Sequence, residues 1–116
     1  MKILNYRGWA WIENNTLQQD SNSITGKYLF FSDSKDLLID LAKKVLDEYD
    51  LLKAKVPSSD IPNNSKGFGF VLCIYDTNNK YCDELKKLET NDISFRYWKS
   101  DNTTRAGKYS KQYMNN

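Results

Sequence analysis

GKYLFFSDSKDLLIDLAKKVLDEY, residues 26–49, contains the two patterns that decide the fold. Its first six residues form a nearly continuous apolar run, which is typical of a central β-strand covered on both faces. Ser32 or Asp33 can then cap a helix, because a short side-chain oxygen accepts a hydrogen bond from an otherwise unpaired amide of the first turn. Apolar residues recur at helical spacing from Leu37 to Tyr49, with charged residues between them. The stretch therefore predicts a strand followed by an amphipathic helix.

Shorter runs on either side of this unit predict the rest of a sheet. Strands are expected at residues 8–12, 51–56, 68–75 and 93–99. Pro57 ends the second of these runs, and residues 58–67 have the composition of a loop. A second helix is expected over residues 80–90, where Tyr81, Leu85 and Leu88 would be buried.

Two helices and one sheet predict a single α+β domain over residues 1–116, built as two layers with both helices on one face of the sheet. Side chains alternate between the faces of a strand, so Ala54, Val56, Phe95 and Tyr97 are expected to point toward the helices. The face without helices is then available for binding. It would receive the following cationic and aromatic side chains: Lys53, Lys55, Arg96 and Trp98, with Trp9 and Trp11 as further candidates.

Composition limits the kinds of function that remain open. The chain of 116 residues has no histidine, which removes the commonest general base and the usual zinc ligand. Cys73 and Cys82 do not have the spacing of a metal or redox pair and are expected to be free thiols of a cytoplasmic protein. No apolar run approaches the ~20 residues that cross a bilayer. We therefore expect no metal, no cofactor and no membrane association.

The end of the chain has the features that a site for a phosphorylated ligand would use. Residues 93–110, ISFRYWKSDNTTRAGKYS, join an aromatic strand to a polar turn, and the basic charge of the chain is concentrated there. Lysine and arginine donate charged hydrogen bonds to phosphate oxygens, and tryptophan offers a plane on which a base can stack. We expect Lys55, Lys99 and Arg105 to hold phosphate, and Trp98 with Trp11 or Trp9 to stack a base.

Each of these features also has a purely structural interpretation. The tryptophans could complete a core, and Lys53 and Lys55 could be edge-strand lysines that oppose aggregation. Asp101 with Thr104 could form no more than a side-chain-to-backbone turn. The binding interpretation depends on all of these features agreeing.

Several short blocks of the chain, in this order, resemble the basophilic-leukaemia-expressed protein family, whose members are often described as phosphothreonine lyase domain proteins. These blocks are residues 26–31, 54–56, 73–76, 97–101 and 104–109. The resemblance implies a fold like that of the mRNA cap-binding initiation factor, with a curved, mostly antiparallel sheet, helices on its convex side and a ligand cleft on its concave side. It also implies the following site residues: Lys55, Lys99, Asp101, Thr104, Arg105, Gly107 and Tyr109. A lyase of this kind would use a histidine acid, which the chain lacks, so lyase chemistry is not expected.

The leading hypothesis is a non-catalytic protein that binds or sequesters a small phosphorylated ligand, most simply a nucleotide or a cyclic nucleotide signal, for example in a phage that counters host defence. One alternative is an inhibitor or adaptor that binds a protein through its aromatic face. Another is a lyase-type enzyme with Lys55 or Lys99 as its base, and a fourth is RNA binding without sequence preference. Whether two chains share one cleft is left open.

Overall fold

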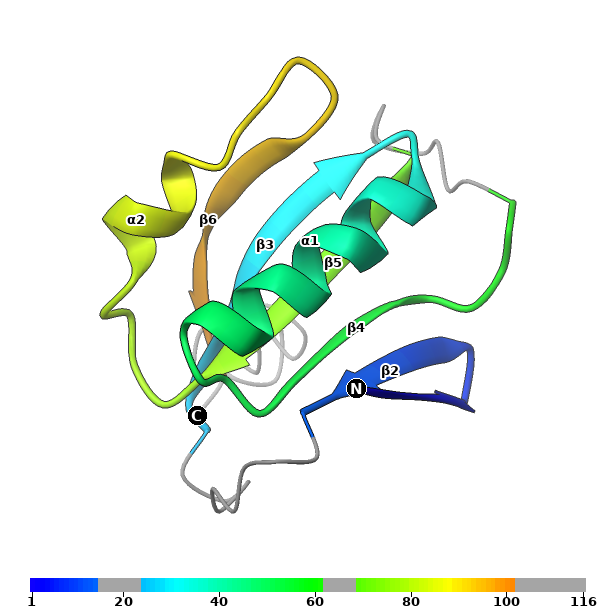
Figure 1. Ribbon diagram of the computed structural model, residues 1–116, viewed down its shortest axis with the longest axis horizontal. Coiled ribbons are helices and arrows are strands. Elements are labelled where there is room, and N and C mark those ends of the chain that lie inside the picture. The colour runs from blue at the N-terminus through cyan, green and yellow to red at the C-terminus, as the bar shows by residue number, and fades with distance from the viewer. Residues whose placement is uncertain (15–23, 62–68, 102–116) are drawn as a thin grey trace, which may run out of the picture.

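A computed structural model of the chain describes residues 1–14, 24–61 and 69–101 (Figure 1). These residues form a six-stranded antiparallel sheet in the order β1-β2-β4-β5-β3-β6, together with two helices. The strands are β1 (Lys2–Tyr6), β2 (Trp9–Glu13), β3 (Gly26–Ser32), β4 (Lys53–Pro57), β5 (Phe70–Asp76) and β6 (Ser94–Ser100), and the helices are α1 (Lys35–Glu48) and α2 (Cys82–Lys86). The predicted α+β fold is confirmed.

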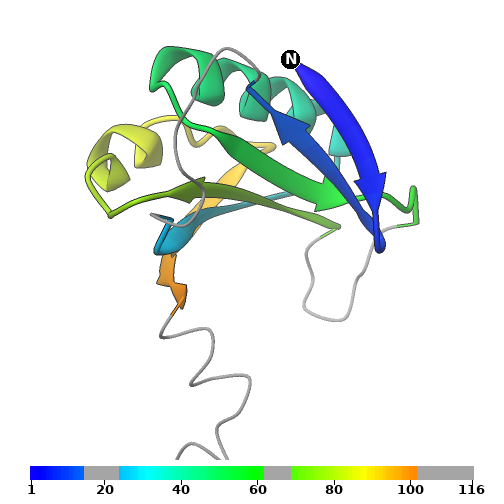
Figure 2. The same ribbon diagram turned by 90° about the horizontal axis from the view of Figure 1, so that it is seen from below.

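Both helices lie on the same side of the sheet, and Figure 2 shows no helix among the described residues on the other side. Helix α1 packs across β2, β3, β4 and β5. Alternate residues of these strands, such as Ala54 and Val56 of β4, are fully buried beneath it. The described residues therefore share one core, and the second face of the sheet is available for other contacts.

The start of α1 differs in detail from the prediction that Ser32 or Asp33 caps it. Ser34 is the N-cap, and its hydroxyl accepts a hydrogen bond from the Leu37 amide at 3.3 Å. Ser32 accepts instead from the Ser34 amide, at 3.0 Å, and the Asp33 carboxylate accepts from the Gly69 amide, at 3.1 Å. The cap lies further along because the first two polar side chains fix the turn that leads out of β3.

Helix α2 is shorter than the predicted helix over residues 80–90. After Lys86 the amides of Leu88 and Glu89 donate to carbonyls three residues back, which tightens the last turn. Thr90 then accepts hydrogen bonds from the amides of Asp92 and Ile93, which ends the helical segment and starts β6. Neither helix among the described residues is long and apolar enough to cross a membrane.

Strand β1 is not predicted by the sequence. It pairs with β2 through a two-residue turn in which Arg7 and Gly8 both have positive φ, at 53° and 84°, and Tyr6 pairs with Trp9. All five residues of β1 are exposed, so the strand shows no alternation of buried and exposed positions. The alternation on which a strand prediction depends is therefore missing.

A β-bulge in β6 reverses the predicted orientation of the last residues of that strand. Phe95 pairs with Phe30 of β3, but the next residue of β3, Leu29, pairs with Tyr97, so Arg96 is an extra residue. Beyond the bulge Trp98 pairs with Tyr28 on the helix side, where the two ring centroids lie 4.9 Å apart. The predictions that Trp98 lies on the helix-free face and that Tyr97 points toward the helices are therefore wrong.

Behind this pair, the Tyr28 hydroxyl lies in a buried polar network. It donates a hydrogen bond to the Asp76 carboxylate, at 2.7 Å, and accepts one from the Tyr81 amide, at 3.1 Å. Lys80 forms an ion pair with Asp76, at 3.6 Å. Burial, followed by the hydrogen bond to Asp76, raises the pKa of Tyr28 well above its ordinary value. The network joins the start of α2 to the centre of the sheet.

Candidate functional site

The helix-free face of the sheet collects lysines from three strands. Lys27 of β3 pairs with Lys99 of β6, and Lys55 of β4 pairs with Trp11 of β2. Lys27, Lys55 and Trp11 each lie between residues that are buried on the helix side, so these side chains point to the opposite side. Lys99 lies on the same face as Lys27, its partner in register. We call this surface the basic-aromatic face and define it by the following seven residues: Trp9, Trp11, Lys27, Lys53, Lys55, Tyr75 and Lys99.

Three ammonium groups of the basic-aromatic face converge on the ring of Tyr75. The Nζ atoms of Lys27, Lys53 and Lys55 lie 5.7, 5.6 and 5.9 Å from its centroid. Tyr75 pairs in register with Lys27, and Lys55 pairs with Cys73, two residues before Tyr75. Antiparallel pairing of β4, β5 and β3 therefore brings together cations that are far apart in the sequence.

Tryptophans from β2 extend this surface. The Lys55 Nζ lies 4.0 Å from the Trp9 ring centroid and 5.1 Å from that of Trp11, within the range of cation–π contacts. Trp11 also stacks on Tyr75, with centroids 5.8 Å apart and an interplanar angle of 24°. The rings therefore hold the lysine head groups in place and leave aromatic surface beside them.

No ion pair within the part of the chain that the structure describes neutralises a lysine of the basic-aromatic face. There the ion pairs are Lys35 with Asp60 and Lys80 with Asp76, and neither involves a lysine of the face. Half-burial lowers the pKa of Lys55, and Lys27 and Lys53 lower it further, against an opposing effect of Cys73. Crowded, partly desolvated cations of this kind are stabilised by a bound anion.

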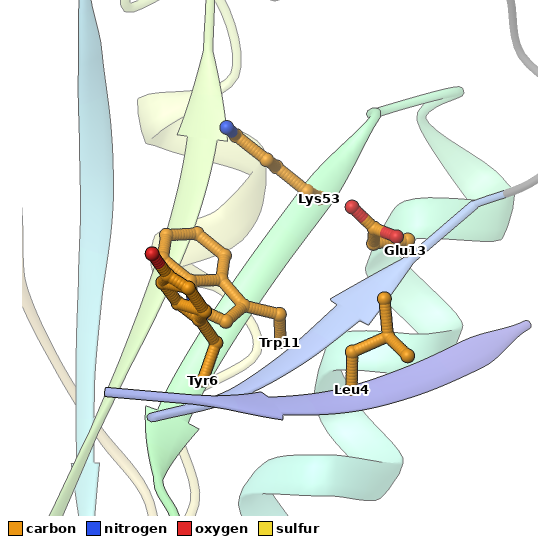
Figure 3. Close-up of a pocket in the computed structure, with 5 residues that line it drawn as sticks. All are labelled: Leu4, Tyr6, Trp11, Glu13 and Lys53. Atoms are coloured by element: carbon orange, nitrogen blue, oxygen red, sulfur yellow. The ribbon is translucent and has the colours of Figure 1, made fainter. Parts of the chain in front are cut away.

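A groove of about 290 Å³ adjoins the lysines at the β1–β2 side of the same face (Figure 3). Figure 3 shows Tyr6 and Trp11 toward one end of the groove and Leu4 and Glu13 toward the other. Lys53 completes the lining. Because Trp11 and Lys53 belong both to the groove and to the basic-aromatic face, the two form one continuous surface.

A second hollow has the opposite character. It has a volume of about 230 Å³, lies beside the first turn of α1, and is lined by Ser32, Asp33, Ser34, Leu37, Asn91 and Asp92. Its charged side chains are carboxylates, which repel an anion. Within the described residues no group of three His, Cys, Asp or Glu side chains could hold a metal ion either. The basic-aromatic face is therefore the better candidate site.

Three of the predicted site residues lie on the helix-free face of the sheet, and a fourth lies on the opposite face. Lys55, Lys99 and Trp11 share the helix-free face, whereas Trp98 lies on the helix side against Tyr28. Asp101 follows β6, where its amide donates to the Thr25 carbonyl, at 2.6 Å. Burial raises the pKa of Tyr75 well above its ordinary value, and the charges of Cys73 and Asp101 raise it further. The remaining predicted residues, Thr104, Arg105, Gly107 and Tyr109, lie outside the described residues.

Sequence reasoning missed five residues of this surface. Lys27 and Tyr75 alternate with the buried residues of β3 and β5, so a consistent assignment of faces would have found them. Leu4 and Tyr6 belong to the unpredicted strand β1, which has no alternation of buried and exposed positions. Glu13 ends β2, one residue beyond the strand predicted at residues 8–12. Arg96 was expected on the helix-free face and does lie there, with its guanidinium 5.6 Å from the Phe31 ring centroid.

No protein-family model, curated protein or solved structure matches this chain. The resemblance to the basophilic-leukaemia-expressed protein family, and the likeness to the cap-binding initiation factor that it implies, therefore stay predictions. The functional argument depends on the geometry of the basic-aromatic face alone.

Proposed function

We propose that this protein binds a small phosphorylated ligand of the nucleotide type and does not transform it. One observation carries the proposal: the ammonium groups of Lys27, Lys53 and Lys55 all lie 5.6–5.9 Å from the centroid of a single ring, that of Tyr75. A phosphate group placed among these ammonium groups, away from the electron-rich face of the ring, would meet several charged donors at once. Hydrogen bonds between ionised partners are about twice as strong as neutral ones. Phosphate is therefore the ligand group that suits this surface best.

The aromatic rings beside the lysines favour a nucleotide over free phosphate. A base stacked on an aromatic side chain typically contributes ~1–3 kcal/mol. Trp11 offers such a ring, and its stacking on Tyr75 places it next to the point where the lysines converge. A ligand that joins a planar base to a phosphate would use both parts of the basic-aromatic face.

Binding without catalysis follows from the chemistry of the same groups. The chain has no histidine to act as an acid at neutral pH. A lysine base would have to lose its proton, and the phosphate would then lose a cation that holds it. If Lys55 or Lys99 is nevertheless a base, product would form from a phosphorylated peptide or a cyclic nucleotide and would disappear on Lys55→Met or Lys99→Met.

Thermal shift and calorimetry with a panel of ligands test the proposal. The panel contains inorganic phosphate, pyrophosphate, mononucleotides, nucleoside diphosphates and cyclic nucleotides, and at least one ligand that carries a base should raise the melting temperature. The double substitution Lys53→Ala with Lys55→Ala should weaken binding of that ligand by at least ~100-fold, since each of the two charged hydrogen bonds contributes ~1.5–3 kcal/mol. Lys43→Ala with Lys44→Ala removes two exposed lysines of α1 and is the matched control. The proposal fails if no ligand in the panel shifts the melting temperature at millimolar concentration.

A protein-binding role is the second candidate, because Tyr6 and Tyr97 expose 54% and 49% of their surface. Exposed tyrosines near a basic surface are typical of protein interfaces. A partner held by the rings would be lost on Trp11→Ala and retained on Lys55→Ala in a pull-down with the purified partner. A nucleotide would respond to both substitutions.

A further inference from the structure

The outer side of β1 is an open edge of the sheet. Strands β1 and β6 are the two edge strands, and no described residue pairs with the outer side of β1. The β6 edge has features that oppose pairing with another strand, because the bulge at Arg96 interrupts its ladder and α2 packs against it. Strand β1 pairs with β2 without a bulge, and its three central residues, Ile3, Leu4 and Asn5, carry no charge. The β1 edge is therefore the one that another strand can extend.

Exposed apolar side chains gather along this edge. Met1, Ile3, Leu4 and Tyr6 each expose between 42% and 54% of their surface, and all four lie in β1 or next to it. The other large apolar residues exposed within the described ranges are scattered over three separate segments: Leu37, Ile61 and Tyr97. An apolar patch that follows an open strand edge is typical of a surface covered by a further strand.

The pairing of β1 with β2 determines which backbone groups point outward. In a two-residue hairpin the residues that flank the turn exchange two hydrogen bonds, so Tyr6 bonds to Trp9. Bonded and non-bonded pairs alternate along an antiparallel ladder, so Leu4 also bonds to β2. The amides and carbonyls of Ile3 and Asn5 lie between these bonded positions and point away from the sheet.

The ladder on the other side of β2 agrees with this assignment. The Ser58 amide donates to the Gly8 carbonyl at 3.0 Å, and the Asn14 amide donates to the Leu52 carbonyl at 2.9 Å. Even-numbered residues of this segment therefore direct their backbone groups toward β4. The odd-numbered residues between them direct theirs toward β1, as the hairpin pattern requires.

We propose that β1 pairs antiparallel with β1 of a second copy of this chain, about a two-fold axis at Leu4. In this register the outward backbone groups of Ile3 meet those of Asn5 of the second copy, so that each donor has an acceptor. Leu4 lies opposite its own equivalent in a non-hydrogen-bonded pair, the type of pair in which side chains are closest. A two-fold axis lets one surface serve as both halves of the interface.

The length and charge of β1 favour this register over its neighbours. Leu4 is the middle residue of Lys2–Tyr6, so only an axis there pairs all five residues of the strand. An axis at Lys2 would place two ammonium groups opposite each other, which is unfavourable. With the axis at Leu4, Lys2 lies opposite Tyr6 of the second copy instead. A cation beside an aromatic ring is a favourable contact.

Such a dimer would also enlarge the candidate site. Leu4 and Tyr6 lie on β1 and line the groove, as Figure 3 shows. Pairing at Leu4 would bring the grooves of the two copies together across the axis, on the same face of one continuous sheet. The inference goes beyond the proposed function and does not depend on it, because it rests on the strand edge and needs no ligand.

Sedimentation of the free protein over a series of concentrations tests the proposal. A pair of five-residue strands forms a small interface, so we expect a monomer–dimer equilibrium that shifts toward dimer as the concentration rises from micromolar to millimolar. Leu4→Lys should raise the dissociation constant of the dimer at least ~10-fold, because it places two like charges opposite each other. Leu37→Lys alters an exposed leucine of α1 and is the matched control. The melting temperature shows that each variant is folded.

Disulfide trapping tests the register. Opposite residues of a non-hydrogen-bonded pair have Cα atoms about 4.5 Å apart, within the range that a disulfide bridges. Leu4→Cys should therefore form a disulfide between two copies on mild oxidation. Asn5→Cys is the control, because Asn5 lies diagonally across from its equivalent, beyond the ~7 Å that a disulfide spans. Mass spectrometry of the linked peptides separates this product from disulfides of Cys73 or Cys82, which are free thiols.

Three results would overturn the inference. The protein could stay monomeric at every concentration, or it could dimerise equally well with Leu4→Lys. Asn5→Cys could form the disulfide as readily as Leu4→Cys, which would place the axis elsewhere. Assemblies that keep growing with concentration would mean that β1 pairs with the β6 edge of the next copy instead. None of these measurements involves a ligand, so the proposed function stands or falls separately.

Discussion

The ammonium group of Lys55 lies 4.0 Å from the centroid of the Trp9 ring, although 45 residues separate the two along the sequence. The contact forms because β2 and β4 are neighbours in the sheet and direct both side chains to the helix-free face. The ring attracts the cation and at the same time shields it from water. Lys55 is therefore the cation of this surface whose charge depends most on its surroundings.

We expect ligand affinity to fall as pH rises above neutrality, earlier than an ordinary lysine would allow. Lys55 holds phosphate only when it is protonated, and burial together with Lys27 and Lys53 lowers its pKa below 10.5. Affinity is therefore complete well below this lowered pKa and is lost as pH rises through it. Losing one charged hydrogen bond corresponds to a ~10-fold or larger change in the dissociation constant, measured by calorimetry between pH 7 and pH 10.

Lys55→Arg separates this effect from the titration of the other lysines. Arginine stays charged throughout this pH range, so the variant should lose less affinity than the wild-type protein between pH 7 and pH 10. Identical pH profiles for the two proteins would show that Lys55 does not contact the phosphate.

Two tryptophans, one on each side of the sheet, should respond differently to substitution. Trp98 packs against Tyr28 on the helix side, so Trp98→Leu should lower the free energy of unfolding by about 1–3 kcal/mol and leave ligand affinity unchanged. Trp11→Leu should reduce affinity by the ~1–3 kcal/mol that a stacked base contributes. Urea denaturation and calorimetry on the same two variants measure both quantities. If the Trp98→Leu variant is fully folded under the assay conditions and still loses affinity for the ligand, the assignment of the two tryptophans to opposite faces is wrong.

The sequence predicts most of the fold, because burial controls the periodicity of the central elements. Strand β5 and helix α1 have buried faces with periods of 2 and 3.6 residues, so their existence and type are readable from the apolar pattern. Strand β1 has no buried face. The bulge at Arg96 shifts the register of β6 by one residue, and the residue types of the strand are those of a regular strand. Neither feature leaves a signal in the apolar pattern.

The candidate site is predictable to the extent that it follows this alternation. Lys55 and Trp11 lie between buried residues of their strands, so the sequence assigns them to the helix-free face. Trp98 lies beyond the bulge, where the alternation is reversed, and this places it on the other side. Glu13 enters the site only through β1, whose pairing with β2 forms the groove.

The buried hydroxyl of Tyr28 should contribute measurably to stability. Tyr28→Phe removes a donor to the Asp76 carboxylate and an acceptor for the Tyr81 amide, and leaves both groups without that partner. An unsatisfied buried group costs about 1–3 kcal/mol, so the variant should unfold at lower urea concentration by a corresponding amount. Tyr49→Phe alters a half-buried tyrosine whose ring packs on the ring of Tyr81, and it serves as the control. Equal stability of Tyr28→Phe and wild type would mean that water replaces the lost hydrogen bonds.

Gly26 and Gly8 should tolerate alanine to different degrees, because different physical effects constrain them. A Cβ atom on Gly26 would collide with the Trp98 ring and lie 2.8 Å from the Lys99 carbonyl oxygen, a backbone atom that cannot move aside easily. Gly26→Ala should therefore cost at least about 1–3 kcal/mol of stability, as overpacking does. At Gly8 a Cβ atom meets nothing within 4 Å, and only the positive φ of 84° opposes it, which costs about 1 kcal/mol. Because Lys99 belongs to the basic-aromatic face, Gly26→Ala should also lower the affinity for the phosphorylated ligand. Gly8→Ala should lower this affinity less. Equal unfolding midpoints for the two variants would contradict the close packing of Trp98 over the start of β3.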